Sequence, residues 1–218
     1  AAHYSNLTSS QTLDFSDTFL SAAHVIAAFP RYSVVFRTKS GESLTPESAH
    51  PPYRITFSEE STELICTCYP APSSNPYLPH ELQDEAESRG NSIEFTEAQV
   101  EAIRSGMSTG LTMIVGPPGT GKTDVAVQII SNLYHSYPEQ RILVITRSNH
   151  ALNDLFSKIA ERAIQPRHVL RLGMGERELE SDKDYSRLGR VEYCLQRRDQ
   201  LLTVVKRLAV SLGCSEDV

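Results

Sequence analysis

Residues 111–123 read LTMIVGPPGTGKT and decide the fold of the second half of this 218-residue chain. The run at 111–115 is short and apolar, which is typical of a strand buried on both faces of a parallel sheet. It passes into the pattern G-x-x-x-x-G-K-[ST] at 116–123, and residues 124–134 then repeat apolar side chains at helical spacing. A strand, a glycine-rich loop and a helix in this order predict a phosphate-binding loop (P-loop) rather than a simple glycine-rich turn.

The residue types of this loop each have a chemical reason. Glycine at three positions, Gly116, Gly119 and Gly121, lets the backbone turn sharply and bring its N–H groups close to an anion. We expect Lys122 to reach the β- and γ-phosphates of a nucleoside triphosphate and the Thr123 hydroxyl to bind Mg²⁺. Lys122 and Thr123 are therefore the predicted catalytic residues, and Thr123 is the predicted metal ligand.

A glutamine upstream of the loop indicates which nucleotide binds. Phe95, Thr96 and Gln99 lie at the start of a helix predicted over residues 97–106. A glutamine amide donates and accepts hydrogen bonds at once, which matches the N6/N7 edge of adenine. Alternatively, Thr96 caps the helix and Gln99 is an ordinary surface residue. The P-loop that follows favours adenine, so we predict ATP and Mg²⁺ as cofactors, bound by Gln99, Gly116, Pro117, Pro118, Gly119, Thr120, Gly121, Lys122 and Thr123.

A second strand–helix unit is predicted downstream, with strands at 142–145 and 169–172 around a helix at 149–162. Its segment 146–152, TRSNHAL, follows the carboxyl end of a strand, where open α/β sheets place their ligands. Ser148, Asn149 and the helix N-terminus could bind a nucleic-acid backbone. Equally, Ser148 or Asn149 could simply cap the helix, and the residues fit both interpretations.

The remaining chain predicts accessory structure. A helix at 18–29 and strands at 33–37, 54–57 and 63–67 predict a small β-rich region over residues 1–69. Residues 70–92 hold four prolines and an acidic run, as in a linker. Residues 93–175 then form the α/β part, and 176–218 a charged loop and a long amphipathic helix at 185–212, the start of an inserted helical subdomain. The fold class is therefore α/β, a partial P-loop NTPase domain with a parallel sheet.

Charge and cysteine content limit the alternatives. The net charge is −6, but residues 93–218 hold 16 acidic and 16 basic side chains, so any basic nucleic-acid surface must be local. The arginines of the long helix lie near many carboxylates, which favours a solvated mixed-charge face. No C-x-x-C pair joins the four cysteines, so we expect free thiols and no zinc. No signal sequence or run of 18 apolar residues is present, which predicts an intracellular, soluble chain without membrane contact.

The order of three motifs resembles a known family. FTEAQ at 95–99, GPPGTGKT at 116–123 and TRSNHALNDL at 146–155 resemble the Q, Walker A and Ia motifs of superfamily 1 RNA helicases, the group that includes the nonsense-mediated-decay helicase. The stretch from 93 to 213 is similar to an intron-binding, spliceosomal branch of that group. By position, the resemblance implies that Gln99 binds adenine, that the P-loop binds phosphate and Mg²⁺, and that Ser148, Asn149 and Ala151 lie along the RNA.

The resemblance also implies a larger assembly. It implies two RecA-like domains, RNA-stimulated ATP hydrolysis, pre-mRNA intron RNA and spliceosomal scaffold proteins as partners, and a nuclear location. The chain shows no acidic Walker B pair after an apolar strand, so we expect a fragment or truncation with little ATPase activity alone. Two alternatives stay open: a non-catalytic spliceosomal interaction module with a vestigial nucleotide site, and a small-molecule kinase, which would not explain Gln99 or the SNHAL segment.

Overall fold

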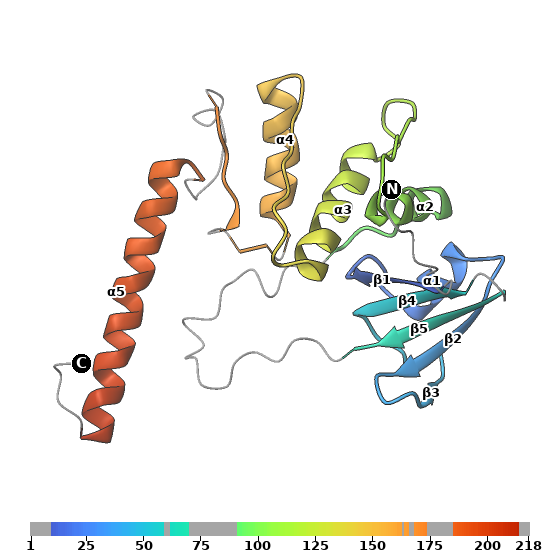
Figure 1. Ribbon diagram of the computed structural model, residues 1–218, viewed down its shortest axis with the longest axis horizontal. Coiled ribbons are helices and arrows are strands. Elements are labelled where there is room, and N and C mark those ends of the chain that lie inside the picture. Colours follow the sequence, from blue (N-terminus) through green and yellow to red (C-terminus); the bar gives the residue numbers. More distant parts are fainter. Residues whose placement is uncertain are drawn as a thin grey trace, which may run out of the picture. The chain divides into compact units, whose positions relative to one another are not determined.

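A computed structural model describes residues 10–58, 62–69, 91–162, 164–165, 168–173 and 185–213. These residues form an α/β structure with five strands and five helices (Figure 1). Residues 70–90 of the predicted linker and 176–184 of the predicted charged loop lie outside the described residues. The chain divides into two compact units, Ala1–Ser74 with Gly90–Leu143 and Asn75–Arg89 with Val144–Val218, and each is described by itself.

The first unit contains a five-stranded mixed sheet in the order β1-β4-β5-β2-β3. Strands β2 and β5 run parallel, and the other neighbours run antiparallel. The three strands predicted in this region are confirmed, whereas β1 and β3 were not anticipated. The bounds are β1 Ser10–Ser16, β2 Ser33–Thr38, β3 Ser43–Leu44, β4 Tyr53–Ser58 and β5 Glu63–Cys68.

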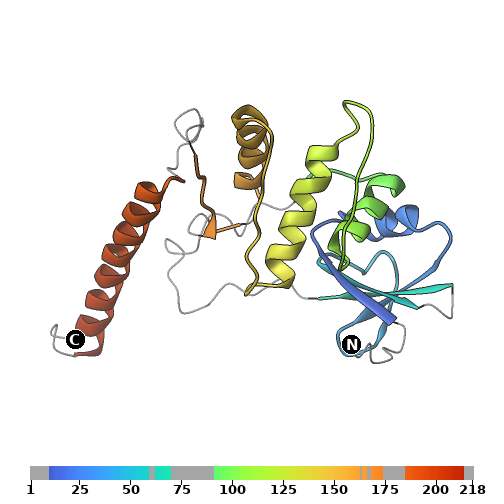
Figure 2. The same cartoon turned by 45° about the horizontal axis from the view of Figure 1, so that its top comes forward.

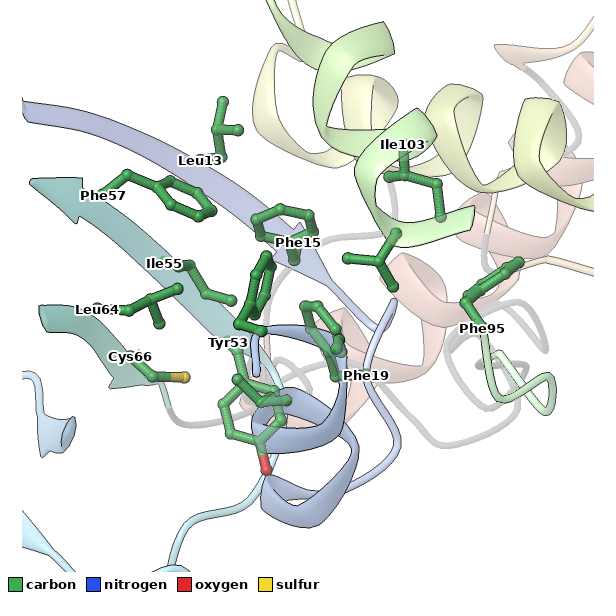
Figure 3. Packing of buried hydrophobic residues seen from close by; sticks show 14 of the residues in the cluster. Leu13, Phe15, Phe19, Tyr53, Ile55, Phe57, Leu64, Cys66, Phe95 and Ile103 are labelled. Carbon is green, nitrogen blue, oxygen red and sulfur yellow. The ribbon is translucent and has the colours of Figure 1, made fainter. Parts of the chain in front are cut away.

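One hydrophobic core joins this sheet to three helices of the first unit (Figure 3). The helices are α1 (Ala22–Ala28), α2 (Glu97–Met107) and α3 (Lys122–Ser136). Phe15 and Ile55 from the sheet, Ile103 from α2 and Val125 from α3 belong to the same cluster of buried side chains. The P-loop helix and the β-rich region therefore share a core. Within it, aromatic rings meet edge to face, a geometry that adds to the energy of area burial.

Helices α1, α2 and α3 agree with the predicted ones, with one difference at the start of α1. Ser21 accepts a hydrogen bond from the backbone N–H of His24, so α1 begins at Ala22 rather than at residue 18. Thr18 instead lies in the turn between β1 and α1 and is fully buried. The buried face of α2 consists of Val100, Ile103 and Met107.

The three strands predicted at 111–115, 142–145 and 169–172 are not formed, and this prediction was wrong. The chain between α2 and α3 is drawn as coil in Figure 2. Leu111 is 96% exposed and Val115 84%, whereas a doubly buried strand would hide both. The physical reason is that a parallel strand needs hydrogen-bonded neighbours, and no described residue pairs with these runs. The sheet of this structure lies in the first 69 residues instead.

The second unit holds α4 (Asn149–Ala160) and α5 (Arg187–Leu212). Both helices begin and end close to the predicted residues. The apolar face of α4 is buried, while the leucines and valines of α5 are largely exposed. No helix in the described part of the chain is both long and apolar enough to cross a membrane.

Candidate functional site

The P-loop turns on glycines whose backbone angles other residues rarely adopt. Gly119 and Gly121 have φ angles of 79° and 72°, in the left-handed region. Gly121 is also the N-cap of α3 and carries no side chain over the first turn, so the helix N-terminus is open toward the loop. The Thr120 hydroxyl donates to the Pro117 carbonyl at 2.9 Å and braces the loop from within. The predicted glycine-rich loop that turns sharply and leads directly into a helix is therefore confirmed.

Lys122 folds its side chain back over this loop. Its Nζ donates to the carbonyl oxygens of Gly116 at 2.8 Å and Pro117 at 2.6 Å. The ammonium group is therefore already placed over the loop. A phosphate oxygen, which carries more negative charge than a carbonyl oxygen, could replace the two carbonyls as its acceptor. Thr123 follows in the first turn of α3 and is exposed.

Gln99 lies against the P-loop, although 17 residues separate it from Gly116. Its Nε2 donates to the Thr120 carbonyl at 3.2 Å, and its Oε1 accepts from the Thr96 backbone N–H at 2.9 Å. The side chain therefore takes part in capping α2, a role that neither interpretation gave it, and it also contacts the P-loop. Phe95 is buried in the core, which leaves Gln99 and Thr96 as the members of this group near the loop.

The donor set of the loop fits a triphosphate with Mg²⁺. Anion binding at a helix N-terminus needs backbone N–H groups without side-chain caps, and Gly121 provides this at the start of α3. A hydroxyl oxygen suits Mg²⁺, which prefers hard oxygen ligands. Lys122 and Thr123 are thus the residues that would hold phosphate and metal. Among the described residues, no group of three or more histidine, cysteine, aspartate or glutamate side chains forms a separate metal site.

Replacing Gly121 with alanine is expected to weaken ATP binding about tenfold or more. A Cβ at this position would lie 2.6 Å from Gln99 Nε2, so the glutamine must leave the loop, and the φ of 72° adds backbone strain of roughly 1–2 kcal/mol. Calorimetric titration of ATP with Mg²⁺ measures the effect. Gly110→Ala is the matched control, since its φ is 115° and nothing lies within 4 Å of the added carbon. Wild-type affinity in Gly121→Ala would contradict the assignment of Gln99 to the site.

The predicted nucleic-acid segment lies at the start of α4, in the second unit. The Ser148 hydroxyl accepts from the Ala151 backbone N–H at 3.2 Å and caps the helix. Asn149 Oδ1 accepts from Arg171 Nη2 at 3.4 Å. Ser148, Asn149 and Ala151 are all exposed. The segment therefore shows the capping role for Ser148, while its exposed helix N-terminus keeps the backbone-binding interpretation open.

Arg171 lies within the run 169–172 that was predicted as a strand, and the structure buries its side chain. It is 2% exposed, and its Nε donates to Asn153 Oδ1 at 3.0 Å on α4. Its guanidinium also donates to the Leu172 carbonyl. The arginine therefore holds the first two turns of α4 through Asn149 and Asn153. An asparagine every fourth residue, at 149 and 153, was the sequence signal for a shared polar partner on this helix face.

The three cysteines in the described part of the chain are free thiols. Cys66 and Cys68 lie two residues apart in β5, and so on one face of the strand, and Cys194 is exposed. Burial raises the pKa of the Cys66 thiol, so it stays protonated within the core.

Two family models match the chain. The first, described as AAA domain, matches residues 94–210, and the second, the insert domain of intron-binding protein aquarius, matches residues 8–102. The two matched ranges overlap at residues 94–102, which include Gln99 and the first half of α2.

Individual proteins are similar over the same regions. RNA helicase aquarius of Mus musculus is 49% identical over 237 residues, covering 100% of this chain and 15% of that protein. Pre-mRNA-splicing factor cwf11 of Schizosaccharomyces pombe is 29% identical over 119 residues, covering 54% of this chain and 9% of that protein. Regulator of nonsense transcripts 1 of Caenorhabditis elegans is 35% identical over 85 residues, covering 39% of this chain and 8% of that protein.

The resemblance to superfamily 1 RNA helicases that the motif order predicted is confirmed by these relatives. The chain spans only 15% or less of the length of each of the three proteins. The AAA domain match covers more than half of the chain and includes the P-loop and Gln99. The chain belongs to this AAA domain family.

Proposed function

We propose that this chain is the ATP-binding part of an RNA helicase that acts in pre-mRNA splicing. The observation that carries the proposal is the position of Gln99, whose amide lies 3.2 Å from the carbonyl of Thr120 inside the P-loop. A donor–acceptor amide beside a phosphate-binding loop is the pairing that an adenine nucleotide needs. The similarity to RNA helicase aquarius and to a pre-mRNA-splicing factor supports the process.

Nucleotide binding would exchange internal hydrogen bonds for ligand contacts. Lys122 would leave the carbonyls of Gly116 and Pro117 for the β- and γ-phosphates, and the N–H groups at the start of α3 would face the same anion. Mg²⁺, bound through Thr123, supplies charge neutralisation on the phosphates. Gln99 would turn its amide from Thr96 and Thr120 to the adenine edge. For Lys122, the exchange replaces neutral carbonyl acceptors by charged phosphate oxygens, which form stronger hydrogen bonds.

RNA would run past the start of α4. Ser148, Asn149 and Ala151 expose the helix N-terminus, which favours a phosphate group. Because Arg171 engages Oδ1 of Asn149, the amide can donate from Nδ2 to the RNA backbone. Such contacts do not distinguish RNA from DNA. Intron RNA, spliceosomal scaffold proteins as partners and a nuclear location are therefore part of the proposal, supported by the similarity to RNA helicase aquarius and to a pre-mRNA-splicing factor.

The ATPase activity of the whole protein, measured with and without single-stranded RNA, tests this function. We expect RNA to stimulate hydrolysis, and we expect Asn149→Ala to raise the RNA concentration for half-maximal stimulation about tenfold or more, as the loss of one hydrogen bond to a charged group implies. The basal rate should stay unchanged. Ser157→Ala, exposed farther along α4, is the control.

Three other outcomes would contradict the proposal in different ways. ATP binding without any RNA-dependent turnover in the whole protein would favour the non-catalytic interaction module. Phosphate transfer to a metabolite without an effect of RNA would favour a small-molecule kinase. Unchanged RNA dependence in Asn149→Ala would remove the start of α4 from the RNA path.

A further inference from the structure

The turn between β1 and α1, Asp17–Thr18, contacts both parts of the chain that would hold the nucleotide. It belongs to the β-rich region, far in sequence from the P-loop. Its polar groups form hydrogen bonds with α3, which begins at the P-loop, and with residues 91–95, which lead into α2 and Gln99. Neither set of contacts is used in the proposed chemistry.

The contacts to α3 are deeply buried. Gln128 Nε2 donates to Asp17 Oδ1 at 2.8 Å and to Thr18 Oγ1 at 3.1 Å. Asn132 Nδ2, one helical turn farther on, donates to Thr18 Oγ1 at 2.8 Å. Gln128, Asn132 and Thr18 are each 0% exposed. Losing one partner inside such a network leaves a buried polar group without a hydrogen bond, which fixes the position of α3 tightly.

The contacts to the start of α2 come from the same turn. The backbone N–H of Asn91 donates to Asp17 Oδ2 at 2.7 Å, and Asn91 Nδ2 donates to the Thr18 carbonyl at 3.3 Å. Four residues on, the carbonyl of Phe95 forms a hydrogen bond with His24 Nε2 of α1 at 2.8 Å. The chain is therefore held at both ends of residues 91–95, just before Thr96 and Gln99.

One carboxylate thus joins the two halves of the candidate site. Asp17 Oδ1 holds α3 and Oδ2 holds the entry to α2, both at distances typical of charge-assisted hydrogen bonds. The separation between Gln99 and the P-loop depends on how α2 and α3 are placed relative to each other. A shift of one helix would leave each half intact but would spoil their spacing.

We propose that Asp17 is a positioning residue that sets the distance between Gln99 and the P-loop, so that the β-rich region determines the selectivity for ATP. The inference rests on the proposed nucleotide function. The β-rich region would thus influence which base is selected, although none of its residues would contact the base.

Asp17→Asn tests the inference with almost no change of volume. The new amide places an N–H₂ group opposite a donor, either Gln128 Nε2 or the Asn91 N–H. Either that link breaks, or Gln128 turns its amide over and gives up its bonds to Thr18 and Asn132. We expect the ratio of ATP to GTP affinity to fall about tenfold. Affinity for inorganic tripolyphosphate with Mg²⁺, which needs only the P-loop, should stay within about twofold of wild type. All three probes are measured by calorimetry on the full chain.

Controls separate positioning from general destabilisation. A variant that only unfolds would lose affinity for ATP, GTP and tripolyphosphate by one common factor. Asp14→Asn is the matched carboxylate-to-amide change on β1, where the carboxylate pairs with Arg54 at 2.9 Å, and should keep the selectivity. If Asp17→Asn fails to fold, Gln128→Met removes the donor to Asp17 Oδ1 with little change of volume and should lower the ratio in the same way.

The outcomes distinguish this inference from the function on which it rests. If wild type binds none of the three probes, the nucleotide function is wrong and the inference falls with it. If wild type prefers ATP and folded Asp17→Asn and Gln128→Met keep that preference, only the positioning role is overturned.

Discussion

Lys122→Ala is expected to reduce the affinity for ATP with Mg²⁺ at least a hundredfold, to the point where calorimetry detects no binding. The ammonium group is the only charged side chain of the P-loop, residues 116–123, and two charge-assisted contacts to phosphate at about 1.5–3 kcal/mol each account for the loss. The side chain holds only the neutral carbonyls of Gly116 and Pro117 in this structure, so its removal should cost little stability.

A lysine elsewhere in the first unit provides the control for this experiment. Lys39 is exposed beyond β2, and Lys39→Ala changes the net charge by the same amount. We expect it to bind ATP as wild type does. Wild-type affinity in Lys122→Ala would refute the assignment of the phosphate site, since no other side chain in the loop could supply the charge.

Phe15→Ala is expected to destabilise the first unit by about 3–5 kcal/mol. The Phe15 side chain is 0% exposed, and its ring lies 5.2 Å from that of Phe19 and 6.4 Å from that of Phe57. Because the sheet, α2 and α3 share this core, the loss should appear in both the β-rich region and the P-loop helix. Urea denaturation gives the free energy, and hydrogen exchange of amides in β4 and α3 shows where it acts.

An exposed apolar residue of the same unit serves as comparison. Ile26 on α1 is 44% exposed, and Ile26→Ala should cost less than about 1 kcal/mol. If Phe15→Ala loosened the sheet but left the exchange of α3 unchanged, the β-rich region and the P-loop helix would not share one cooperative core.

The parts that could be predicted from sequence are those set by local chemistry. The P-loop and the four longer helices follow from glycine spacing, capping residues and apolar periodicity, all of which act within a few residues. The motif order singled out Gln99, and the structure places its side chain against the P-loop. The alternation of Leu13 and Phe15 with polar residues would have revealed β1, since this is the period of a half-buried strand.

The parts that were missed depend on contacts distant in sequence. Residues 111–115 have the composition of a buried strand, but a strand forms only when a neighbour supplies its hydrogen bonds. Gln128 and Asn132 look like polar surface positions of an amphipathic helix, yet Asp17 and Thr18, more than 100 residues away, make them buried partners. Arg171 was missed for the same reason, because its acceptors lie on α4.

The most direct measurement of the central claim is a calorimetric titration of the wild-type chain with ATP and with GTP, each with Mg²⁺. The account predicts saturable one-to-one binding of ATP through the P-loop and weaker binding of GTP, because an amide that donates and accepts matches the N6/N7 edge of adenine but not the two acceptors O6 and N7 of guanine. Absence of binding to either nucleotide, or equal affinity for both, would contradict it.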